Sequence, residues 1–364
     1  MSGPAAGTAV AATTTDVVCL GESMVTFLPS QPGRLADVPS FGRGIGGAES
    51  NVACALAAAG HRAAWVGRVG ADGFGDHLVE TIASYGVDTS AVRRDPVRPT
   101  GIYFRTATDR GTDTHEVAYY RAGSAASAMS PSNVPYEELF AGRILHLSGI
   151  TAALSDDCLA LLRELTAARP GRPLVSFDVN HRPHLWRGGD ASVLLELARW
   201  SDLVFVGEDE AEEAWGIVGA EAIRAAVPEP SVLVVKRGSA GATVFASGLR
   251  PGPRSSIAGG AEGTDTVTHV PALHVDVVAA VGAGDAFAAG FLSATLRGLP
   301  VRDRVRHGHL MAAAVLTVPG DLTEPPARDH ADRLVALDDD AWGTLRLGPG
   351  WTAADRASEE VRTP

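Results

Sequence analysis

Residues 281–290 read Val-Gly-Ala-Gly-Asp-Ala-Phe-Ala-Ala-Gly, which places two glycines and an aspartate at the expected start of a small-residue helix. The first N–H groups of a helix have no partner within it, and the helix dipole adds partial positive charge there. Gly282 and Gly284, on either side of Ala283, let the backbone approach a ligand closely. The stretch therefore predicts a cradle for an anion, typically a phosphate.

Asp285 lies directly beside this cradle, where a carboxylate would repel an anion unless it served the chemistry. We expect it to accept the proton of a hydroxyl that attacks the phosphate. The alternative is an ordinary turn in which the aspartate only caps a helix. At a helix start, Asp285 is expected to keep a low pKa and to act as a weak base.

Strand-like and helix-like segments alternate along the chain, which predicts an α/β fold with a mainly parallel sheet. The expected strands are residues 16–21, 63–69, 143–148, 173–178, 202–206 and 231–236. The expected helices are residues 48–60, 74–85, 155–168, 192–200 and 208–215. Residues 24–45 and 100–122 break this alternation and look like antiparallel strands, which we interpret as a small β-sheet lid that excludes water. A plain surface hairpin is the alternative.

Composition limits the possible partners and location. The chain has 364 residues, and 31 Lys and Arg against 43 Asp and Glu leave a net charge of −12, which argues against nucleic-acid binding. Three scattered cysteines, with no C-x-x-C motif, favour a reducing cytoplasm. No apolar run reaches membrane-spanning length. We expect a disordered lead over residues 1–15, one α/β domain over 16–336, a flexible loop over 246–266 and an acidic irregular tail over 337–364.

Three further groups of residues are candidates for a site at the carboxyl ends of the strands. Asp178, Asn180 and Arg182 alternate after a strand, in a segment expected to be extended before Pro183. The second group is the glycine-rich helix entry with Gly46, Gly47 and Asn51. The third is the turn with Lys236, Gly238 and Gly241, which predicts a hairpin and, as a further hypothesis, a contact with a nucleotide. Each could instead be purely structural. The histidines lack the spacing of a zinc site, and no Walker-type phosphate loop is present.

Together these motifs resemble the ribokinase-type (PfkB) family of sugar kinases, over roughly Val17 to Val335. The resemblance rests on Gly46-Gly47-x-x-x-Asn51-x-Ala53, Gly67-x-x-Gly70-x-Asp72-x-Phe74-Gly75 and Gly282-Ala283-Gly284-Asp285. It implies a three-layer α/β/α sandwich with a β-sheet lid. Within the family, the likeness is greatest to 2-keto-3-deoxygluconate (KDG) kinases, through Tyr119-Tyr120-Arg121-x-Gly123-Ser124-Ala125-Ala126 and Asp178-x-Asn180-x-Arg182-Pro183-x-Leu185-Trp186.

The resemblance implies ATP-dependent phosphorylation of KDG at its 6-hydroxyl, with Mg²⁺ bridging the ATP phosphates. Asp285 would be the base, and the N–H groups of Gly282 to Gly284 would stabilise the moving phosphoryl group. The implied sugar site comprises Gly46, Gly47, Asn51, Tyr103, Tyr119, Arg121, Arg182 and Asp285. The implied nucleotide site comprises Lys236, Gly238, Gly241, Gly282 and Gly284.

The chain departs from the family pattern at two places. Ala279 and Ala280 replace the usual Asp-Thr near a monovalent-cation site, which puts potassium activation in doubt. Gly207 replaces the Asn of the magnesium motif, so Glu210 remains as a water-mediated Mg²⁺ candidate. The alternatives are a fructokinase or other hexose or nucleoside kinase and, in a different class, a sugar-acid-binding protein with weakened catalysis. We expect a homo-oligomer, with a dimer through the lid as one form.

Overall fold

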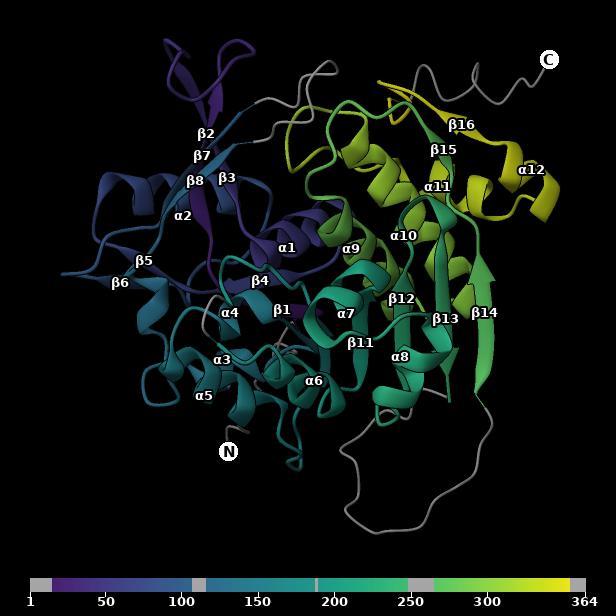
Figure 1. Ribbon diagram of the computed structural model, residues 1–364, viewed down its shortest axis with the longest axis horizontal. Helices are drawn as coiled ribbons and strands as arrows, with labels where there is room; N and C mark the ends of the chain where they lie inside the picture. The colour runs from purple at the N-terminus through teal and green to yellow at the C-terminus, as the bar shows by residue number, and fades with distance from the viewer. Residues whose placement is uncertain (1–14, 107–115, 187–188, 248–264, 354–364) are drawn as a thin grey trace, which may run out of the picture.

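A computed structural model describes residues 15–106, 116–186, 189–247 and 265–353. Its main feature is an eight-stranded sheet in the order β14-β13-β12-β11-β10-β9-β1-β4 (Figure 1). The strands from β12 to β4 run parallel, whereas β13 and β14 are antiparallel additions at one edge. The bounds are β1 Val17–Leu20, β4 Ala63–Val66, β9 Ile144–Ser148, β10 Leu174–Asp178, β11 Leu203–Gly207, β12 Val232–Lys236, β13 Ala242–Ala246 and β14 Thr266–Val270.

Helices cover both faces of this sheet, because successive strand residues point to opposite sides. Val17 and Cys19 of β1 enter one hydrophobic core, and Val18 and Leu20 enter the other. The first core is completed by α1 (Ala48–Ala58), α2 (Gly73–Ser84), α9 (Ala283–Leu296), α10 (Val301–Leu316) and α11 (Arg328–Val335). The second is completed by α3 (Tyr136–Leu139), α5 (Asp156–Thr166), α6 (Ser192–Arg199), α7 (Glu208–Trp215) and α8 (Ala220–Ala226). The expected three-layer α/β/α sandwich is confirmed.

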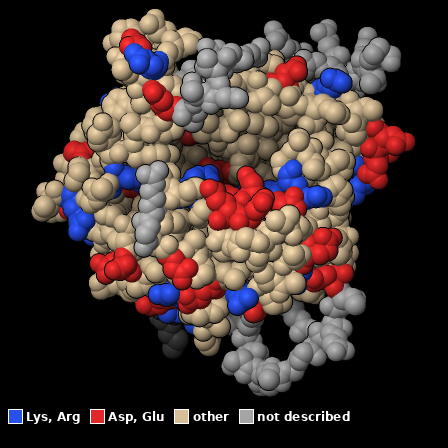
Figure 2. Space-filling model, viewed as in Figure 1, with Lys and Arg blue, Asp and Glu red and all other residues tan. Residues whose placement is uncertain are grey.

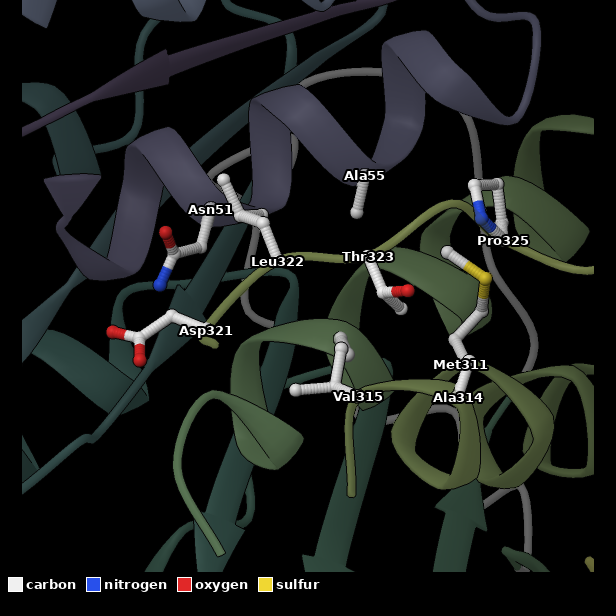
Figure 3. Close-up of a pocket in the computed structure, with 10 residues that line it drawn as sticks. Asn51, Ala55, Met311, Ala314, Val315, Asp321, Leu322, Thr323 and Pro325 are labelled. Carbon is white, nitrogen blue, oxygen red and sulfur yellow. The ribbon is translucent and has the colours of Figure 1, made fainter. Parts of the chain in front are cut away.

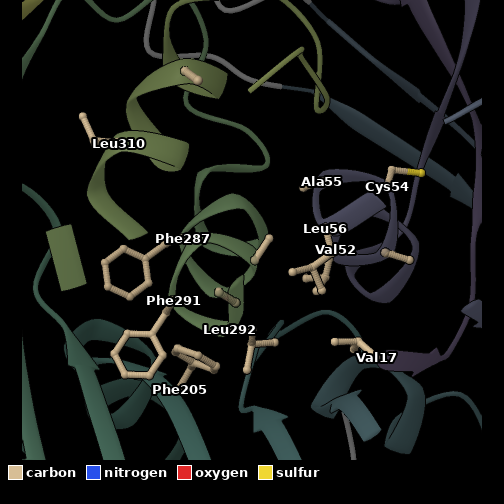
Figure 4. Close-up of a cluster of buried hydrophobic side chains, with 14 of the residues drawn as sticks. Val17, Val52, Cys54, Ala55, Leu56, Phe205, Phe287, Phe291, Leu292 and Leu310 are labelled. Carbon is tan, nitrogen blue, oxygen red and sulfur yellow. The ribbon is translucent and has the colours of Figure 1, made fainter. Parts of the chain in front are cut away.

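Helix α9 lies in the first core, between α1 and α10 (Figure 4). Its small residues allow close packing: Ala288 and Ala289 are fully buried, and a Cβ added to Gly290 would lie 2.4 Å from the carbonyl oxygen of His307. Larger rings anchor the helix to the sheet, since Phe291 meets Phe205 of β11 edge-on with ring centroids 5.4 Å apart. This packing holds the N-terminal end of α9 in place.

A separate four-stranded sheet, which we call the lid sheet, has the order β3-β2-β7-β8. Its strands are β3 (Phe41–Gly46), β2 (Met24–Pro29), β7 (Ile102–Arg105) and β8 (Val117–Tyr120). The two hairpin-like pairs are antiparallel, as expected, and they join through a parallel pairing of β2 with β7. Two other short pairs complete the strands, β5 (Arg68–Gly70) with β6 (Arg93–Asp95) and β15 (His274–Val275) with β16 (Arg346–Leu347).

The prediction of an irregular tail from residue 337 onward is wrong for residues 337–353, the part of the tail that the structure describes. Helix α12 (Asp339–Thr344) begins at Asp338, whose carboxylate accepts a hydrogen bond from the Ala341 N–H. Trp342 and Trp351 are buried in the first core, because their large apolar surfaces outweigh the acidic residues around them. Of the other expectations, the lead at 1–14, the loop at 248–264 and the tail at 354–364 lie outside the described residues.

The remaining short helices are α4 (Gly149–Ala152) and two 3₁₀ turns, η1 (Ala126–Ala128) and η2 (Gly238–Ala240). The η2 turn joins β12 to β13, which confirms the predicted hairpin. Among the described helices, none is long and apolar enough to cross a membrane.

Candidate active site

The carboxyl ends of β10, β11 and β12 bring polar side chains to the N-terminal end of α9. Asp178 ends β10, Lys236 ends β12, and Glu210 lies in the first turn of α7 after β11. Figure 2 shows this face of the molecule hollowed between the lid sheet and α7, with acidic side chains gathered over α7 at the rim. These candidate residues therefore lie together at the carboxyl edge of the sheet, which is where ligands bind in open α/β sheets.

Asp285, in the first turn of α9, accepts a hydrogen bond of 2.9 Å from the side-chain amide of Asn51 on α1. The pKa of Asp285 is raised to about 7, chiefly by burial. The hydrogen bond from Asn51 lowers the pKa, the nearby Asp178 raises it, and Arg182 and Lys236 lower it, so burial outweighs the lowering contributions. The expected low pKa is therefore wrong. Desolvation raises the pKa of the carboxylate by more than the partial positive charge of the helix start lowers it. The resulting pKa suits a general base near neutral pH.

Gly282 is the N-cap of α9 and has φ of 77°, a left-handed conformation that favours glycine. A Cβ at Gly282 would also lie 2.6 Å from the carbonyl oxygen of Asp321, so no side chain fits there. Position 284 faces Lys236, because a Cβ added to Gly284 would lie 3.6 Å from Lys236 Nζ. An anion at this helix start would meet both the free N–H groups and a lysine.

Lys236 Nζ contacts both carboxylate oxygens of Asp178 at 3.1 Å. Burial lowers the pKa of Lys236, but Asp178, Glu210 and Asp285 raise it by more, so the net pKa is raised. The lysine therefore stays protonated and can balance the charge of a phosphate. His146, buried nearby on β9, has its pKa lowered to about 3 by burial and then by Lys236, so it is neutral.

Two predicted site residues, Arg182 and Glu210, contact each other. Arg182 Nη1 lies 3.2 Å from Glu210 Oε1, while Glu210 Oε2 accepts a 2.8 Å hydrogen bond from the N–H of Gly207. Among the described residues, no group of three His, Cys, Asp or Glu side chains is placed to hold a metal ion. A metal ion at this position would therefore need other ligands, such as phosphate oxygens and water.

Tyr103, Tyr119 and Arg121 also cluster, on the lid sheet and just after it. The rings of Tyr103 and Tyr119 are 5.4 Å apart, and the Arg121 guanidinium lies 5.8 Å from the Tyr119 ring centre. The sequence did not predict two neighbours: Glu22, which is buried and paired with Arg121, and His184, which stacks on Tyr119 at 4.7 Å. The 178–186 segment thus reaches the lid sheet.

The glycines predicted to approach ligands have protein neighbours of their own. A Cβ at Gly46 would lie 2.2 Å from Tyr103 Oη, and one at Gly47 would lie 2.4 Å from the carbonyl oxygen of Glu22. Gly241, with φ of 104°, packs against the end of β14, whereas Gly238 has open space around its Cα. Gly46, Gly47 and Gly241 therefore have a structural reason to be glycine.

The extended segment expected after β10 is interrupted at Asn180, which has φ of 40°. It is the only residue other than glycine with positive φ among the described residues, and such a conformation is tolerated best by Asn and Asp. The kink ends the alternation, so Asp178 pairs with Lys236 whereas Arg182 turns toward Glu210. No local sequence signal other than the amino-acid type predicts this turn.

The family model described as pfkB family carbohydrate kinase matches residues 14–328, most of the chain. The chain belongs to this family. Among solved structures, this chain resembles the PfkB protein from Polaromonas sp. JS666, with a TM-score of 0.73 and 31% sequence identity. The match covers 89% of this chain and 100% of the other.

Curated relatives of this carbohydrate kinase include enzymes named 2-dehydro-3-deoxygluconokinase, a synonym of KDG kinase. The one from Bacillus subtilis (strain 168) is 34% identical, over 86% of this chain and 93% of the relative. The one from Thermoproteus tenax is 32% identical, over 88% and 94%. A fructokinase-1 from Oryza sativa subsp. japonica is 31% identical, over 76% and 81%.

Proposed function

We propose that this carbohydrate kinase transfers the terminal phosphoryl group of ATP to the 6-hydroxyl of KDG. The observation that carries the proposal is Asp285 at the start of α9, with a pKa near 7 and a hydrogen bond to Asn51. A base of this pKa can take the proton of an alcohol as its oxygen bonds to phosphorus. The identity to two KDG kinases supports the choice of substrate.

The phosphate half of the site is provided by α9 and Lys236. The N–H groups of Ala283 and Gly284 have no partner within the helix, and Lys236 Nζ is close by. Bound ATP with Mg²⁺ would supply the phosphoryl group and neutralise phosphate charge. Lys236 and the α9 N–H groups would hold the phosphates, the Gly238–Gly241 turn would contact the nucleotide, and Glu210 would contact the ion through water.

The sugar half of the site lies between α1 and the lid sheet. Asn51 can both donate to and accept from a hydroxyl, and Tyr103 and Tyr119 offer phenol groups. We assign the substrate carboxylate to Arg121, with Arg182 as a second cation. Both arginines are paired with glutamates, Glu22 and Glu210, so an acid substrate would share or displace these partners.

A fructokinase activity is the second candidate, and one observation favours it. Because both arginines already have a carboxylate partner, the site carries less excess positive charge than an isolated arginine pair would. A neutral sugar would leave these ion pairs intact. The identity to a rice fructokinase is consistent with this alternative.

A coupled assay of ADP release across a substrate panel tests the proposal. The panel contains KDG, its C4 epimer 2-dehydro-3-deoxygalactonate, fructose, ribose and a nucleoside, each with ATP and Mg²⁺. We expect KDG or its epimer to give the highest kcat/KM, and the product to carry phosphate on the 6-oxygen by NMR. A neutral sugar that exceeds both acids by tenfold would contradict the substrate assignment.

Two controls separate the remaining readings. Asp285→Asn keeps the shape of the side chain but removes the base, so ADP release should stop while the fold is retained. Thermal stabilisation by KDG in the wild-type protein, without any ADP release from the panel, would instead support a sugar-acid-binding protein.

A further inference from the structure

Glu22 lies at the junction between the eight-stranded sheet and the lid sheet, in the short connection from β1 to β2. The chain also passes between the two sheets at residue 47 after β3, at residues 100–101 before β7 and at residues 121–124 after β8. Glu22 is 2% exposed, because these other passages pack around it. A change at this one side chain can therefore reach every one of these passages.

Both the side chain and the main chain of Glu22 take part in these contacts. Glu22 Oε1 accepts a 2.6 Å hydrogen bond from Ser124 Oγ, and Glu22 Oε2 pairs with Arg121 Nη2. A Cβ added to Gly101 would lie 3.0 Å from Glu22 Oε1, and one added to Gly47 would lie 2.4 Å from the carbonyl oxygen of Glu22. Glycine at these two positions therefore makes room for Glu22 at the junction.

The pair with Glu22 orients Arg121 and still leaves it donors for a ligand. The Arg121 side chain is 9% exposed, so little water is present to replace a lost partner. Its Nε is buried and has no hydrogen-bond partner among the described residues, and its guanidinium lies 5.8 Å from the centre of the Tyr119 ring. A guanidinium has five N–H groups, and the pair with Glu22 uses only those on Nη2. A substrate carboxylate can therefore bind Arg121 without displacing Glu22.

A second arginine of the lid sheet, Arg105 on β7, has a different carboxylate partner. Its Nη2 donates a 2.7 Å hydrogen bond to Asp321 Oδ1. Asp321 and Asn51 line one narrow pocket beside α9 (Figure 3). Of these two arginines, Glu22 holds Arg121, so a substitution at Glu22 should act on Arg121 and leave the Arg105 pair intact.

We propose that Glu22 is a positioning residue that fixes the guanidinium of Arg121 at the junction of the two sheets and thereby sets the preference for an acid substrate over a neutral sugar. The inference rests on the proposed kinase function and deepens it. Both carboxylate oxygens of Glu22 are engaged, by Arg121 and Ser124, so Glu22 would act through Arg121 without touching the sugar. A donor that is already held in place loses less conformational freedom when its ligand binds.

Glu22→Gln removes the charge with little change in shape. The glutamine carbonyl can still accept a hydrogen bond from Arg121, and its amide can donate to Ser124 Oγ, so the fold should be retained. The hydrogen bond to the guanidinium loses its charge assistance and holds Arg121 less firmly. We expect the KM for KDG to rise roughly threefold to tenfold, while kcat, the KM for ATP and the kcat/KM for fructose each change by less than about twofold.

A double-variant cycle with Arg121→Ala shows whether Glu22 acts through Arg121. In Arg121→Ala, the Glu22 carboxylate is left buried without its cation and repels an acid substrate. Adding Glu22→Gln should therefore cause no further rise in the KM for KDG and should reverse part of the rise that Arg121→Ala causes. A Glu22 that only supports the fold would instead add its own loss to that of Arg121→Ala.

Ser124→Ala and Asp202→Asn complete the set of variants. Ser124→Ala removes the second hydrogen bond of Glu22 without removing a charge, so it should raise the KM for KDG by less than Glu22→Gln does, and it makes the same test if Glu22→Gln does not fold. Asp202→Asn is the matched control, because it breaks a similar pair with Arg172 just before β11, away from the site. It should lower the melting temperature and leave the KM for KDG unchanged.

The outcomes separate this inference from the proposed function. Wild-type turnover of KDG, with a KM for KDG that stays within about twofold of wild type or falls in Glu22→Gln and Ser124→Ala, would overturn the inference alone. A loss in Glu22→Gln that multiplies with that of Arg121→Ala would overturn it as well. Turnover of neutral sugars only would overturn the substrate assignment together with the inference, and no turnover of any sugar would overturn the proposed kinase function and the inference with it.

Discussion

Replacing Asp285 with asparagine should abolish phosphoryl transfer and, at alkaline pH, make the protein more stable. The pKa of Asp285 is raised from 3.8 to about 7, chiefly by burial. A rise of about three pH units corresponds to about 4 kcal/mol at 1.36 kcal/mol per unit, and solvent around this half-buried side chain reduces that to about 2 kcal/mol. Asparagine has nearly the same shape and can still accept the hydrogen bond from Asn51.

The sign of the pH dependence follows from the direction of the shift. Because the folded-state pKa is higher than the unfolded value, the folded protein holds the proton more tightly between about pH 4 and pH 7. The wild-type free energy of unfolding therefore falls as the pH rises through this range. The asparagine variant has no such proton, so its stability advantage should be absent at pH 4 and complete at pH 8.

Differential scanning fluorimetry and the coupled ADP assay measure the two effects. At pH 8 we expect a melting temperature higher by roughly 4 °C, at about 2 °C per kcal/mol for a protein of this size, with kcat lower by at least about 100-fold. Asp329→Asn, at an exposed carboxylate on α11, is a control that should not gain stability at pH 8. A lower melting temperature at pH 8 for Asp285→Asn, or a kcat within tenfold of wild type, would refute the reasoning.

Three other variants test the rest of the site and the fold. Asn51→Ala removes the hydrogen bond that lowers the pKa of Asp285. The acid limb of the pH profile of kcat/KM should therefore move up by about one pH unit from its wild-type position near pH 7. A limb that does not move would argue against Asp285 as the titrating base. In Arg121→Ala, the KM for KDG should rise at least about tenfold while the KM for fructose changes little, because one charge-assisted contact contributes about 1.5–3 kcal/mol. An equal rise in both KM values would show that Arg121 does not contact the substrate carboxylate. In Trp342→Ala, the free energy of unfolding in urea should fall by about 3–5 kcal/mol, and an unchanged midpoint would mean that α12 adds little to the core.

The order of strands and helices could be predicted because it depends on local patterns. Short β-branched runs ended at polar or glycine residues, and each predicted strand of the parallel part is present within a few residues of its expected bounds. The C-terminal region was mispredicted for the opposite reason. The acidic residues 338–340 indicated a solvated surface, whereas Trp342 and Trp351 are held by contacts with distant helices.

The contacts between distant segments could not be predicted in the same way. Arg105 and Asp321 are separated by 216 residues, and no pattern in either segment indicates that they meet. The same is true of Glu22 with Arg121 and of His184 with Tyr119. Asn180 shows a related limit, since its positive φ depends on how β10 leaves the sheet toward Glu210.

For Asp285 and its cradle, the sequence by itself determined which groups are present: two glycines, free N–H groups and a carboxylate within one helical turn. These features are local, so they follow from adjacent residues and from helix geometry. Only the tertiary structure decided how the carboxylate behaves. Asn51, Asp178 and Lys236 act on Asp285 from three separate elements, and burial, which has the largest effect, raises its pKa from 3.8 to about 7 although Asn51 and Lys236 lower it. A pKa depends on every charge and every solvent molecule around the group, and that environment exists only after the chain has folded.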